Sequence, residues 1–323
     1  MTSAAPQDAG RLAVRVSAID EQADRVRSFR LEPADGSALP PWEPGAHIDV
    51  HLPTGLVRQY SLCGDPAERD AYVIAVLRTP DSRGGSRYLH DTLGGGDTLT
   101  IGAPRNNFPF QARGRRLLFI AGGIGITPIL PMVQQAEREG ESWSLFYGGR
   151  SADSMAYARY LARFGDRVRI VPEDSAGRLD LDEILGRPRT DTEVYCCGPE
   201  GMLKAVRERC DRWPPGHHHE ERFTASRSAQ GAATAHTFRV VARHTGVEVT
   251  VHSDESIADA LTAAGVPVMT SCREGLCGTC QTTVIDGTPD HRDDILGQAE
   301  RASGTTMVLC VSRCRGDRLV LDI

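Results

Sequence analysis

The segment M-T-S-C-R-E-G-L-C-G-T-C-Q, residues 269–281, decides the fold of the C-terminal part of this 323-residue chain. It places Cys272, Cys277 and Cys280 in the pattern C-x4-C-x2-C, which is the ligand spacing of a plant-type [2Fe–2S] cluster. Small residues between the cysteines let backbone N–H groups approach the sulfur atoms, and such hydrogen bonds help to set the reduction potential. The segment therefore predicts a compact iron–sulfur loop.

The fourth cluster ligand must come from another part of the chain, because the loop supplies three. Cys310 and Cys314 both follow the loop, and spacing alone does not choose between them. Structural zinc is an alternative, but zinc sites favour two paired C-x2–4-C hooks, and here one pair is separated by four residues while the last ligand stands alone. Buried thiols without a metal are the remaining alternative.

Length and composition restrict the class of protein. A chain of 323 residues suits two or three domains. The net charge of −6 argues against a general nucleic-acid binder, and no run of 18 apolar residues predicts a membrane span. Nine cysteines, with Cys196 and Cys197 adjacent, favour reduced thiols over a disulfide framework, and residues 1–10 lack the pattern of a secretion signal. We therefore expect a cytoplasmic protein.

The N-terminal part of the chain is predicted to be all-β, and we assign residues 1–112 to a first domain. Short alternating runs separated by Gly, Pro and Asp indicate a small barrel. Strands are expected at residues 12–18, 26–31, 48–51, 72–76 and 98–101.

Two segments of this barrel carry side chains suited to a flat ring that bears a phosphate. In R-Q-Y-S-L, residues 58–62, an Arg can hold a phosphate, a Tyr can lie along a ring, and a Ser hydroxyl can reach a ring nitrogen. Residues 83–89, R-G-G-S-R-Y-L, are expected to begin a helix whose free N–H groups attract an anion. An ordinary strand and an ordinary capped turn are the alternative interpretations.

Residues 113–226 have the pattern of a parallel-sheet domain. The apolar run 117–121 leads into G-G-I-G-I-T-P, residues 122–128, and then into a helix with Thr127 at its N-cap and Gly140 beyond its end. Strand, glycine turn and helix together form the phosphate-binding start of a dinucleotide domain, although G-G-x-G matches the usual G-x-G-x-x-G only in part.

Strands and helices continue to alternate after this turn, which predicts a parallel sheet with ligands at the carboxyl ends of its strands. Cys197 and Gly198, in C-G-P, fall at such an end opposite the glycine turn. A cysteine at a strand end is usually structural, and this position also permits a functional role. Strands are expected at residues 144–147, 168–171 and 193–196, and helices at 155–164, at 181–185 and after residue 202 to about residue 211.

Two further segments of this region need an interpretation. H-H-H, residues 217–219, does not predict a metal site, because consecutive histidines cannot all face one ion. Residues 224–235 are small and polar without apolar periodicity, which predicts a flexible linker, and we place the linker between the domains at 227–235.

Residues 236–323 predict a compact α+β domain around the cysteine loop. Its twelve acidic and eight basic side chains give a balance of −4, which fits an ordinary solvated surface or a docking face for a basic partner. We expect strands at residues 238–241, 247–251, 281–285, 307–311 and 319–323, and a helix at 257–264.

Together these three parts resemble the phthalate dioxygenase reductase family. The likeness covers the chain after its first ten residues, and rests on R-x-Y-S-L and G-G-S in the barrel, G-G-x-G and C-G-P in the sheet domain, and the cysteine loop. It implies a multidomain β and α/β fold with an FMN-binding β-barrel, an NAD-binding parallel α/β domain and a C-terminal plant-type ferredoxin of β-grasp-like α+β type. It also implies a reductase that serves a terminal oxygenase, similar to vanillate O-demethylase reductase.

The resemblance assigns roles to the matching residues. Flavin contacts are implied for Arg58, Gln59, Tyr60, Ser61, Ala75, Val76, Leu77, Gly84, Gly85 and Ser86. Nicotinamide nucleotide contacts are implied for Gly123, Ile124, Gly125, Thr127, Cys197 and Gly198. Ser61, Cys197 and Phe223 would lie beside the reacting rings, with Phe223 against the flavin. The family's V-C-V-S-R context selects Cys310 as the fourth cluster ligand.

The chemistry implied by the residues is consistent with this resemblance. Nicotinamide gives a hydride, which carries two electrons, whereas the cluster accepts one, so a flavin is needed to store the pair and release it singly. Arg150 could bind the 2′-phosphate of NADPH, but no second basic residue follows before Arg159, so we expect NADH. The alternatives are a ferredoxin-like carrier whose other domains are scaffold, and a reductase that serves a cytochrome P450.

Overall fold

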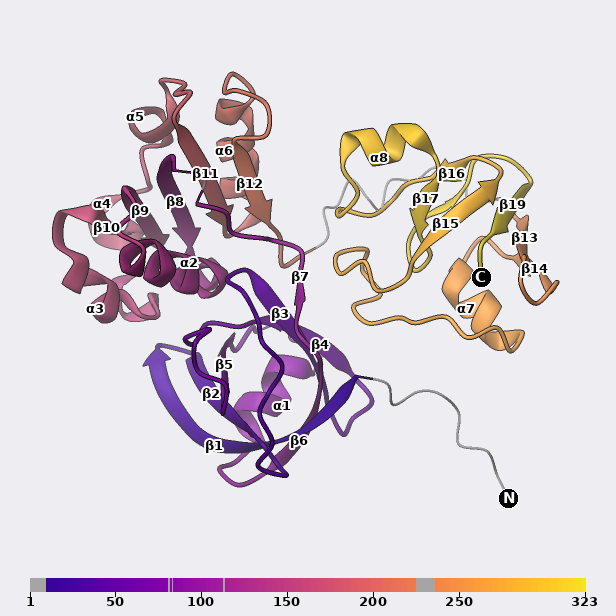
Figure 1. The fold of residues 1–323 in the computed structure, drawn as a ribbon, viewed down its shortest axis with the longest axis horizontal. Helices are drawn as coiled ribbons and strands as arrows, with labels where there is room; N and C mark the ends of the chain where they lie inside the picture. The colour runs from indigo at the N-terminus through magenta and orange to yellow at the C-terminus, as the bar shows by residue number, and fades with distance from the viewer. Residues whose placement is uncertain (1–9, 81, 83, 113, 225–235) are drawn as a thin grey trace. The chain divides into compact units, whose positions relative to one another are not determined.

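The computed structural model describes residues 10–80, 82, 84–112, 114–224 and 236–323. The chain divides into two compact units, Met1–Glu221 and Arg222–Ile323 (Figure 1). The linker expected at residues 227–235 lies outside the described residues, as does Arg83 of the predicted anion-binding turn. None of the helices in the described parts of the chain is both long and apolar enough to cross a bilayer.

The first unit begins with an antiparallel barrel that follows from the alternating pattern of its strands (Figure 1). The strand order is β4-β3-β6-β1-β2-β5, with β7 beside β3, and a bridge between Leu62 and Ile74 joins the two edges. Phe29, Leu31 and Ile48 point inward and are fully buried. The elements are β1 Arg11–Ala23, β2 Val26–Pro33, β3 Ala46–His51, β4 Val57–Ser61, β5 Tyr72–Leu77, α1 Gly85–Asp91, β6 Thr98–Gly102 and β7 Arg105–Asn106.

A five-stranded parallel sheet completes the first unit, in the order β10-β9-β8-β11-β12. Because β8 is apolar on both sides, helices cover both faces: α2 packs with Leu117 and Phe119, whereas α5 and α6 pack with Leu118 and Ile120. The elements are β8 Arg116–Gly122, η1 Gly123–Gly125, α2 Ile126–Arg138, β9 Trp143–Gly149, η2 Ala152–Ser154, α3 Ala158–Leu161, η3 Ala162–Arg167, β10 Val168–Pro172, α4 Glu173–Ala176, α5 Leu181–Leu185, β11 Thr192–Cys197, α6 Glu200–Cys210 and β12 His218–Glu221.

Two local expectations in this sheet domain are wrong. The helix expected at residues 155–164 is short and broken, because Met155 is extended and Tyr157 has a left-handed backbone with φ of 59°. Thr127 is not the N-cap of α2: the helix already includes Ile126, and the Thr127 hydroxyl donates to the Ile124 carbonyl over 3.0 Å. The end of α2 is as expected, with Gly140 in the left-handed region just beyond it.

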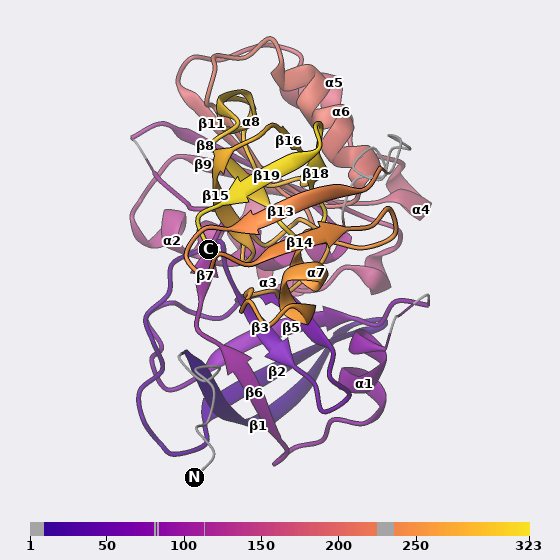
Figure 2. The same ribbon diagram turned by 90° about the vertical axis from the view of Figure 1, so that its right-hand side faces the viewer.

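The second unit is an α+β fold whose main sheet has the order β14-β13-β19-β15-β17. Strands β13 and β19 run parallel, and Figure 2 shows α7 beside β14. The expected strand at residues 307–311 ends at Val308, so Cys310 lies in a turn. The elements are β13 Phe238–Ala242, β14 Glu248–Val251, α7 Ile257–Ala263, β15 Gln281–Asp286, β16 Pro289–Asp290, α8 Gln298–Ser303, β17 Thr306–Val308, β18 Arg313–Cys314 and β19 Arg318–Leu321.

Candidate functional site

The predicted anion-binding residues of the barrel come together at the start of α1. A Cβ placed on Gly85 would lie 2.6 Å from Cγ and 3.0 Å from Nε of Arg58, so only glycine lets the arginine lie across the helix start. Gly84 precedes the helix with φ of 103°, a conformation that favours glycine. The Ser86 hydroxyl, which donates to Ser82 over 3.0 Å, lies in the first turn. A guanidinium beside the start of a helix is suited to a phosphate.

The R-Q-Y-S-L segment forms β4 and distributes its side chains over two faces. Gln59 donates from its amide to the Asp49 carboxylate over 3.0 Å, and Asp49 also accepts two bonds from Arg105, of 2.8 and 2.9 Å. Because side chains alternate along a strand, Arg58 and Tyr60 project from the other face. Gln59 is therefore engaged in the barrel wall, whereas on the other face Arg58 donates to the Val57 carbonyl over 2.8 Å and Tyr60 packs against the barrel core.

The predicted ring-lining residues Ala75, Val76 and Leu77 lie consecutively in β5. Ala75 and Val76 are buried, and the Val76 carbonyl is 2.8 Å from Nε2 of His90. This stretch therefore offers mainly backbone and small apolar side chains to a neighbouring ring.

The two predicted nucleotide turns meet backbone to backbone. A Cβ on Gly125 would lie 2.3 Å from the Cys197 carbonyl oxygen and 2.7 Å from the Gly198 nitrogen. A Cβ on Gly198 would in turn lie 3.0 Å from Cα of Gly122. The turns follow β8 and β11, which are adjacent parallel strands, so they meet at the edge of the sheet where nucleotides bind. Gly123 and Ile124 lie in the same turn, in η1.

Ser61 and Cys197, from the barrel and the sheet domain, are brought together by a third residue, Glu221. Glu221 ends β12 and is the register partner of Cys197 on β11. The Ser61 hydroxyl hydrogen-bonds to the Glu221 carboxylate, whose Oε2 is inaccessible and has no partner among the described residues. Burial raises the pKa of Glu221 to about 8 and raises that of the Cys197 thiol well above its ordinary value. Both groups are therefore mainly protonated near neutral pH.

No role could be assigned to Glu221 from the sequence, because the polar residues around it are typical of an exposed segment. H-H-E-E, residues 218–221, has neither the apolar alternation nor the β-branched residues of a strand, yet it forms β12 at the edge of the sheet. The available signal was its position, two residues before the aromatic Phe223. Phe223 itself is 39% exposed.

Arg150 directly follows β9 and is exposed. Its carbonyl accepts a hydrogen bond of 3.1 Å from the backbone nitrogen of Asp174, in the short helix α4 after β10. The backbone of α4 therefore lies beside Arg150, while the Glu173 carboxylate of that helix pairs with Arg178 at 2.7 Å.

Four cysteines gather in the second unit. The Cys310 thiol interacts with the thiols of both Cys272 and Cys280, and the Cys277 thiol interacts with that of Cys272. Backbone nitrogens also point at the sulfurs, from Glu274 to Cys272 over 3.3 Å and from Thr279 to Cys277 over 3.4 Å. Four thiols with amide donors around them are the donor set of a [2Fe–2S] cluster, so the residues present fit that group.

The pKa shifts of the four thiols also support a shared metal centre. Hydrogen bonds from Cys277 and Cys310 lower the pKa of Cys272, and the same contacts raise the pKa of Cys277 and Cys310. Thiolates this close cannot all be charged unless a cation is shared among them. Cys314 lies apart from the group: it is buried and its thiol donates to the Arg318 carbonyl over 3.4 Å.

Comparison with known proteins identifies two domains in the chain. The model of the 2Fe-2S iron-sulfur cluster binding domain matches residues 241–315, and that of the oxidoreductase NAD-binding domain matches residues 119–208. The vanillate O-demethylase oxidoreductase of Pseudomonas putida is 42% identical over 318 residues, which cover 96% of this chain and 99% of the relative.

Two solved structures resemble nearly the whole chain. A phthalate dioxygenase reductase, described as a modular structure for electron transfer from pyridine nucleotides to [2Fe–2S], has a TM-score of 0.74 and 36% identity, covering 99% of this chain and 100% of its own. An intact type IV self-sufficient cytochrome P450 monooxygenase has a TM-score of 0.88 and 40% identity over 97% of this chain. The match spans 41% of that longer polypeptide.

Proposed function

We propose, because the chain belongs to the phthalate dioxygenase reductase family, that it is the reductase component of an oxygenase system. It takes a hydride from NADH onto FMN and passes the electrons singly, through a [2Fe–2S] cluster, to a terminal oxygenase. The observation that carries the proposal is the pair of sites in one chain: two nucleotide turns meet in the first unit, and four cysteines gather in the second.

Different residues of the first unit bind the flavin and the nicotinamide nucleotide. Arg58 and the start of α1 bind the flavin phosphate, which favours FMN because FMN ends at that group. Tyr60 and β5 flank the flavin ring. Gly125 and Cys197 hold the nicotinamide nucleotide through their backbones. The flavin, when bound, converts a two-electron donor into a one-electron donor.

Ser61, Cys197 and Glu221 do not need to act as strong acids or bases, because hydride transfer moves no proton from the protein. The neutral Cys197 thiol and the protonated Glu221 place no full charge beside the nicotinamide. Ser61 presents a hydroxyl held by Glu221, which orients it for the flavin. Phe223 is assigned to the flavin by the family resemblance alone.

Cys272, Cys277, Cys280 and Cys310 are the proposed cluster ligands. Cys310 interacts with Cys272 and Cys280, the first and last cysteines of the loop, whereas the Cys314 thiol donates to the Arg318 carbonyl. The cysteines of the described residues are all free thiols, which suits a reducing cytoplasm.

We expect NADH to be preferred over NADPH. Arg150 is the basic residue that directly follows β9, and no second basic residue follows before Arg159, so a 2′-phosphate would have a single basic partner. Comparing kcat/KM for the two nucleotides tests this, and a preference for NADPH would contradict it.

One observation supports a cytochrome P450 as an alternative electron acceptor. The chain resembles part of a self-sufficient P450 monooxygenase with a TM-score of 0.88. A separate P450 is therefore the second candidate acceptor. Both acceptors take one electron at a time, so they differ in docking and not in the chemistry of this chain.

Anaerobic mixing of the holoprotein with NADH tests the proposed function. Flavin absorbance should bleach without any partner, and oxidised oxygenase added afterwards should be reduced. In the Cys310→Ser variant the flavin should still bleach while transfer to the oxygenase is lost. An intact flavin that does not bleach would show that the first unit is a scaffold and would refute the proposal.

A further inference from the structure

A short segment joins the two halves of the cysteine set. We call residues 292–294, between β16 and α8, the strap. The backbone nitrogen of Arg292 donates to the Ser312 hydroxyl over 3.2 Å, two residues beyond Cys310. The backbone nitrogen of Asp294 donates to the Gly275 carbonyl over 3.0 Å, inside the loop that carries the other three cysteines. The strap therefore bonds to both parts of the chain that supply the ligands.

The strap lies directly against the cysteine loop. Gly275 has φ of 74°, and a Cβ there would come within 3.0 Å of Cα of Asp293 and 2.7 Å of Cγ2 of Val311. Val311 is the residue after Cys310. No side chain therefore separates the backbone of Asp293 from that of the cysteine loop.

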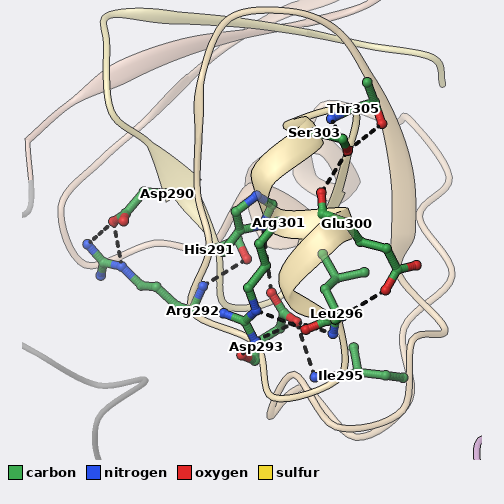
Figure 3. A network of polar contacts seen from close by, with 12 residues as sticks. Asp290, His291, Arg292, Asp293, Ile295, Leu296, Glu300, Arg301, Ser303 and Thr305 are labelled. Carbon is green, nitrogen blue, oxygen red and sulfur yellow. Dashed lines mark hydrogen bonds and ion pairs between the residues drawn. The ribbon is translucent and has the colours of Figure 1, made fainter. Parts of the chain in front are cut away.

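Asp293 is the middle residue of the strap, and its side chain is fully buried. Its Oδ1 accepts from the backbone nitrogens of Ile295 and Leu296, over 3.1 and 2.8 Å. Arg301, on α8, donates to the Asp293 carbonyl and lies 3.4 Å from Oδ1 (Figure 3). Its Nε also donates to the Leu296 carbonyl over 2.9 Å. Arg301 thus fixes the carboxylate in place.

The charge of Asp293 is compensated from one side. Its Oδ2 has no hydrogen-bond partner among the described residues, and it lies 3.8 Å from Nδ1 of His291. Burial lowers the pKa of His291, so the imidazole is neutral at pH 7. Arg301 is the positive group bonded to this carboxylate, and its side chain is 34% exposed.

We propose that Asp293 and Arg301 are positioning residues that set the reduction potential of the cluster by opposite effects of charge. Reduction adds one negative charge to the cluster, so the buried carboxylate of Asp293 disfavours it and the guanidinium of Arg301 favours it. A unit charge about 10 Å from a redox centre, at an effective dielectric constant of about 20, changes a one-electron equilibrium roughly tenfold. The inference rests on the proposed cluster site.

A strap that only braces the loop predicts a different pattern. Loss of either residue would then loosen the same structure, so both variants would change the cluster in the same direction or lose it. Shifts of the reduction potential in opposite directions would show that the charges of the two side chains, and not a loosened loop, change the potential.

Redox titration of the holoprotein, followed by the EPR signal of the reduced cluster, tests the proposal. Asp293→Asn keeps an acceptor for the amides of Ile295 and Leu296 but removes the charge. At a fixed potential it should raise the ratio of reduced to oxidised cluster about tenfold, which is 59 mV for one electron. Arg301→Gln should lower the ratio, Arg301→Lys should stay near the wild type, and the double variant Asp293→Asn with Arg301→Gln should return toward it.

The control is Asp286→Asn, which makes the same charge change at a side chain that is 71% exposed. It should leave the ratio nearly unchanged because solvent screens it. Shifts of one sign in Asp293→Asn and Arg301→Gln, loss of the cluster in both, or a control shift of equal size would overturn the proposal. Absence of iron and sulfide from the wild-type chain would instead refute the cluster site itself.

Discussion

Replacing Glu221 with glutamine tests the buried carboxyl that links the barrel to the sheet domain. The variant keeps a side chain of the same size that can still bond to Ser61, but it cannot ionise. Any difference from the wild type that depends on pH therefore reports the ionisation of Glu221.

The magnitude follows from the shift in pKa. The pKa of Glu221 rises from 4.5 to about 8 on folding, and each unit corresponds to about 1.4 kcal/mol. Below pH 4.5 both the folded and the unfolded chain hold the proton, so stability is fully present. Between pH 4.5 and about 8 the unfolded chain releases it and the folded chain does not, so the free energy of unfolding falls.

The full shift sets an upper limit of about 5 kcal/mol, and we expect about half of it because Glu221 as a whole residue is only half-buried, although its Oε2 is inaccessible. For a unit of this size, 1 kcal/mol moves Tm by about 2–4 °C. Glu221→Gln should therefore melt several degrees above the wild type at pH 8, with little difference at pH 5.

Thermal unfolding of the first unit in the full chain, measured from pH 5 to pH 9, is the assay. The advantage of the variant should grow up to about pH 8 and then stay constant. Glu220→Gln is the matched control, since Glu220 is the neighbouring carboxylate and pairs with Arg207 at 2.8 Å. A constant difference across the pH range, or the same curve for Glu220→Gln, would refute the reasoning.

The remaining predictions concern the two cofactor sites. Cys310→Ser should abolish the visible absorption of the cluster while Cys314→Ser keeps it, and equal loss in both would refute the choice of fourth ligand. Gly275→Ala should at least halve the iron bound per chain, because a Cβ would lie 2.7 Å from Cγ2 of Val311; full iron content would show that the strap can move aside. Arg58→Gln should weaken flavin binding about 10- to 100-fold, the worth of a charged hydrogen bond, as read by flavin fluorescence; unchanged affinity would place the phosphate elsewhere.

Strands with a clear apolar pattern could be located from the sequence, although β1 extends to Ala23, well beyond its expected end at residue 18. The alternating strands of the barrel and the apolar strand β8 both form, because periodicity directly reports which side chains face a core. The C-terminal end of α2 could also be predicted, since Gly140 supplies the left-handed residue that ends a helix. The spacing likewise predicted three of the cluster cysteines, whereas Cys310 was chosen over Cys314 through the family resemblance.

Features set by tertiary contacts could not be predicted in this way. Residues 155–164 have helical composition, but packing holds Tyr157 in the left-handed region and breaks the helix. The polar strand β12 forms because it pairs with β11, not because its residues favour strands. The position of Glu221 opposite Cys197 is a consequence of that register, and no local pattern encodes it.

The turn at Cys310 shows the same limit at the cluster. The apolar run after residue 306 predicts a strand through Val311, yet β17 ends at Val308. Ser312 then bonds back to the Val308 carbonyl over 3.0 Å, which closes a turn around Cys310. The turn places the Cys310 thiol near the cysteine loop, which a strand continued through Val311 would not do.

Rapid-freeze EPR after anaerobic addition of NADH tests the central claim most directly, because it reports where the electrons arrive. In the holoprotein the signal of a reduced [2Fe–2S] cluster should appear after the flavin bleaches, and in flavin-depleted protein it should not appear. Reduction of the cluster by NADH without flavin, or a bleached flavin beside a cluster that stays oxidised, would contradict the account.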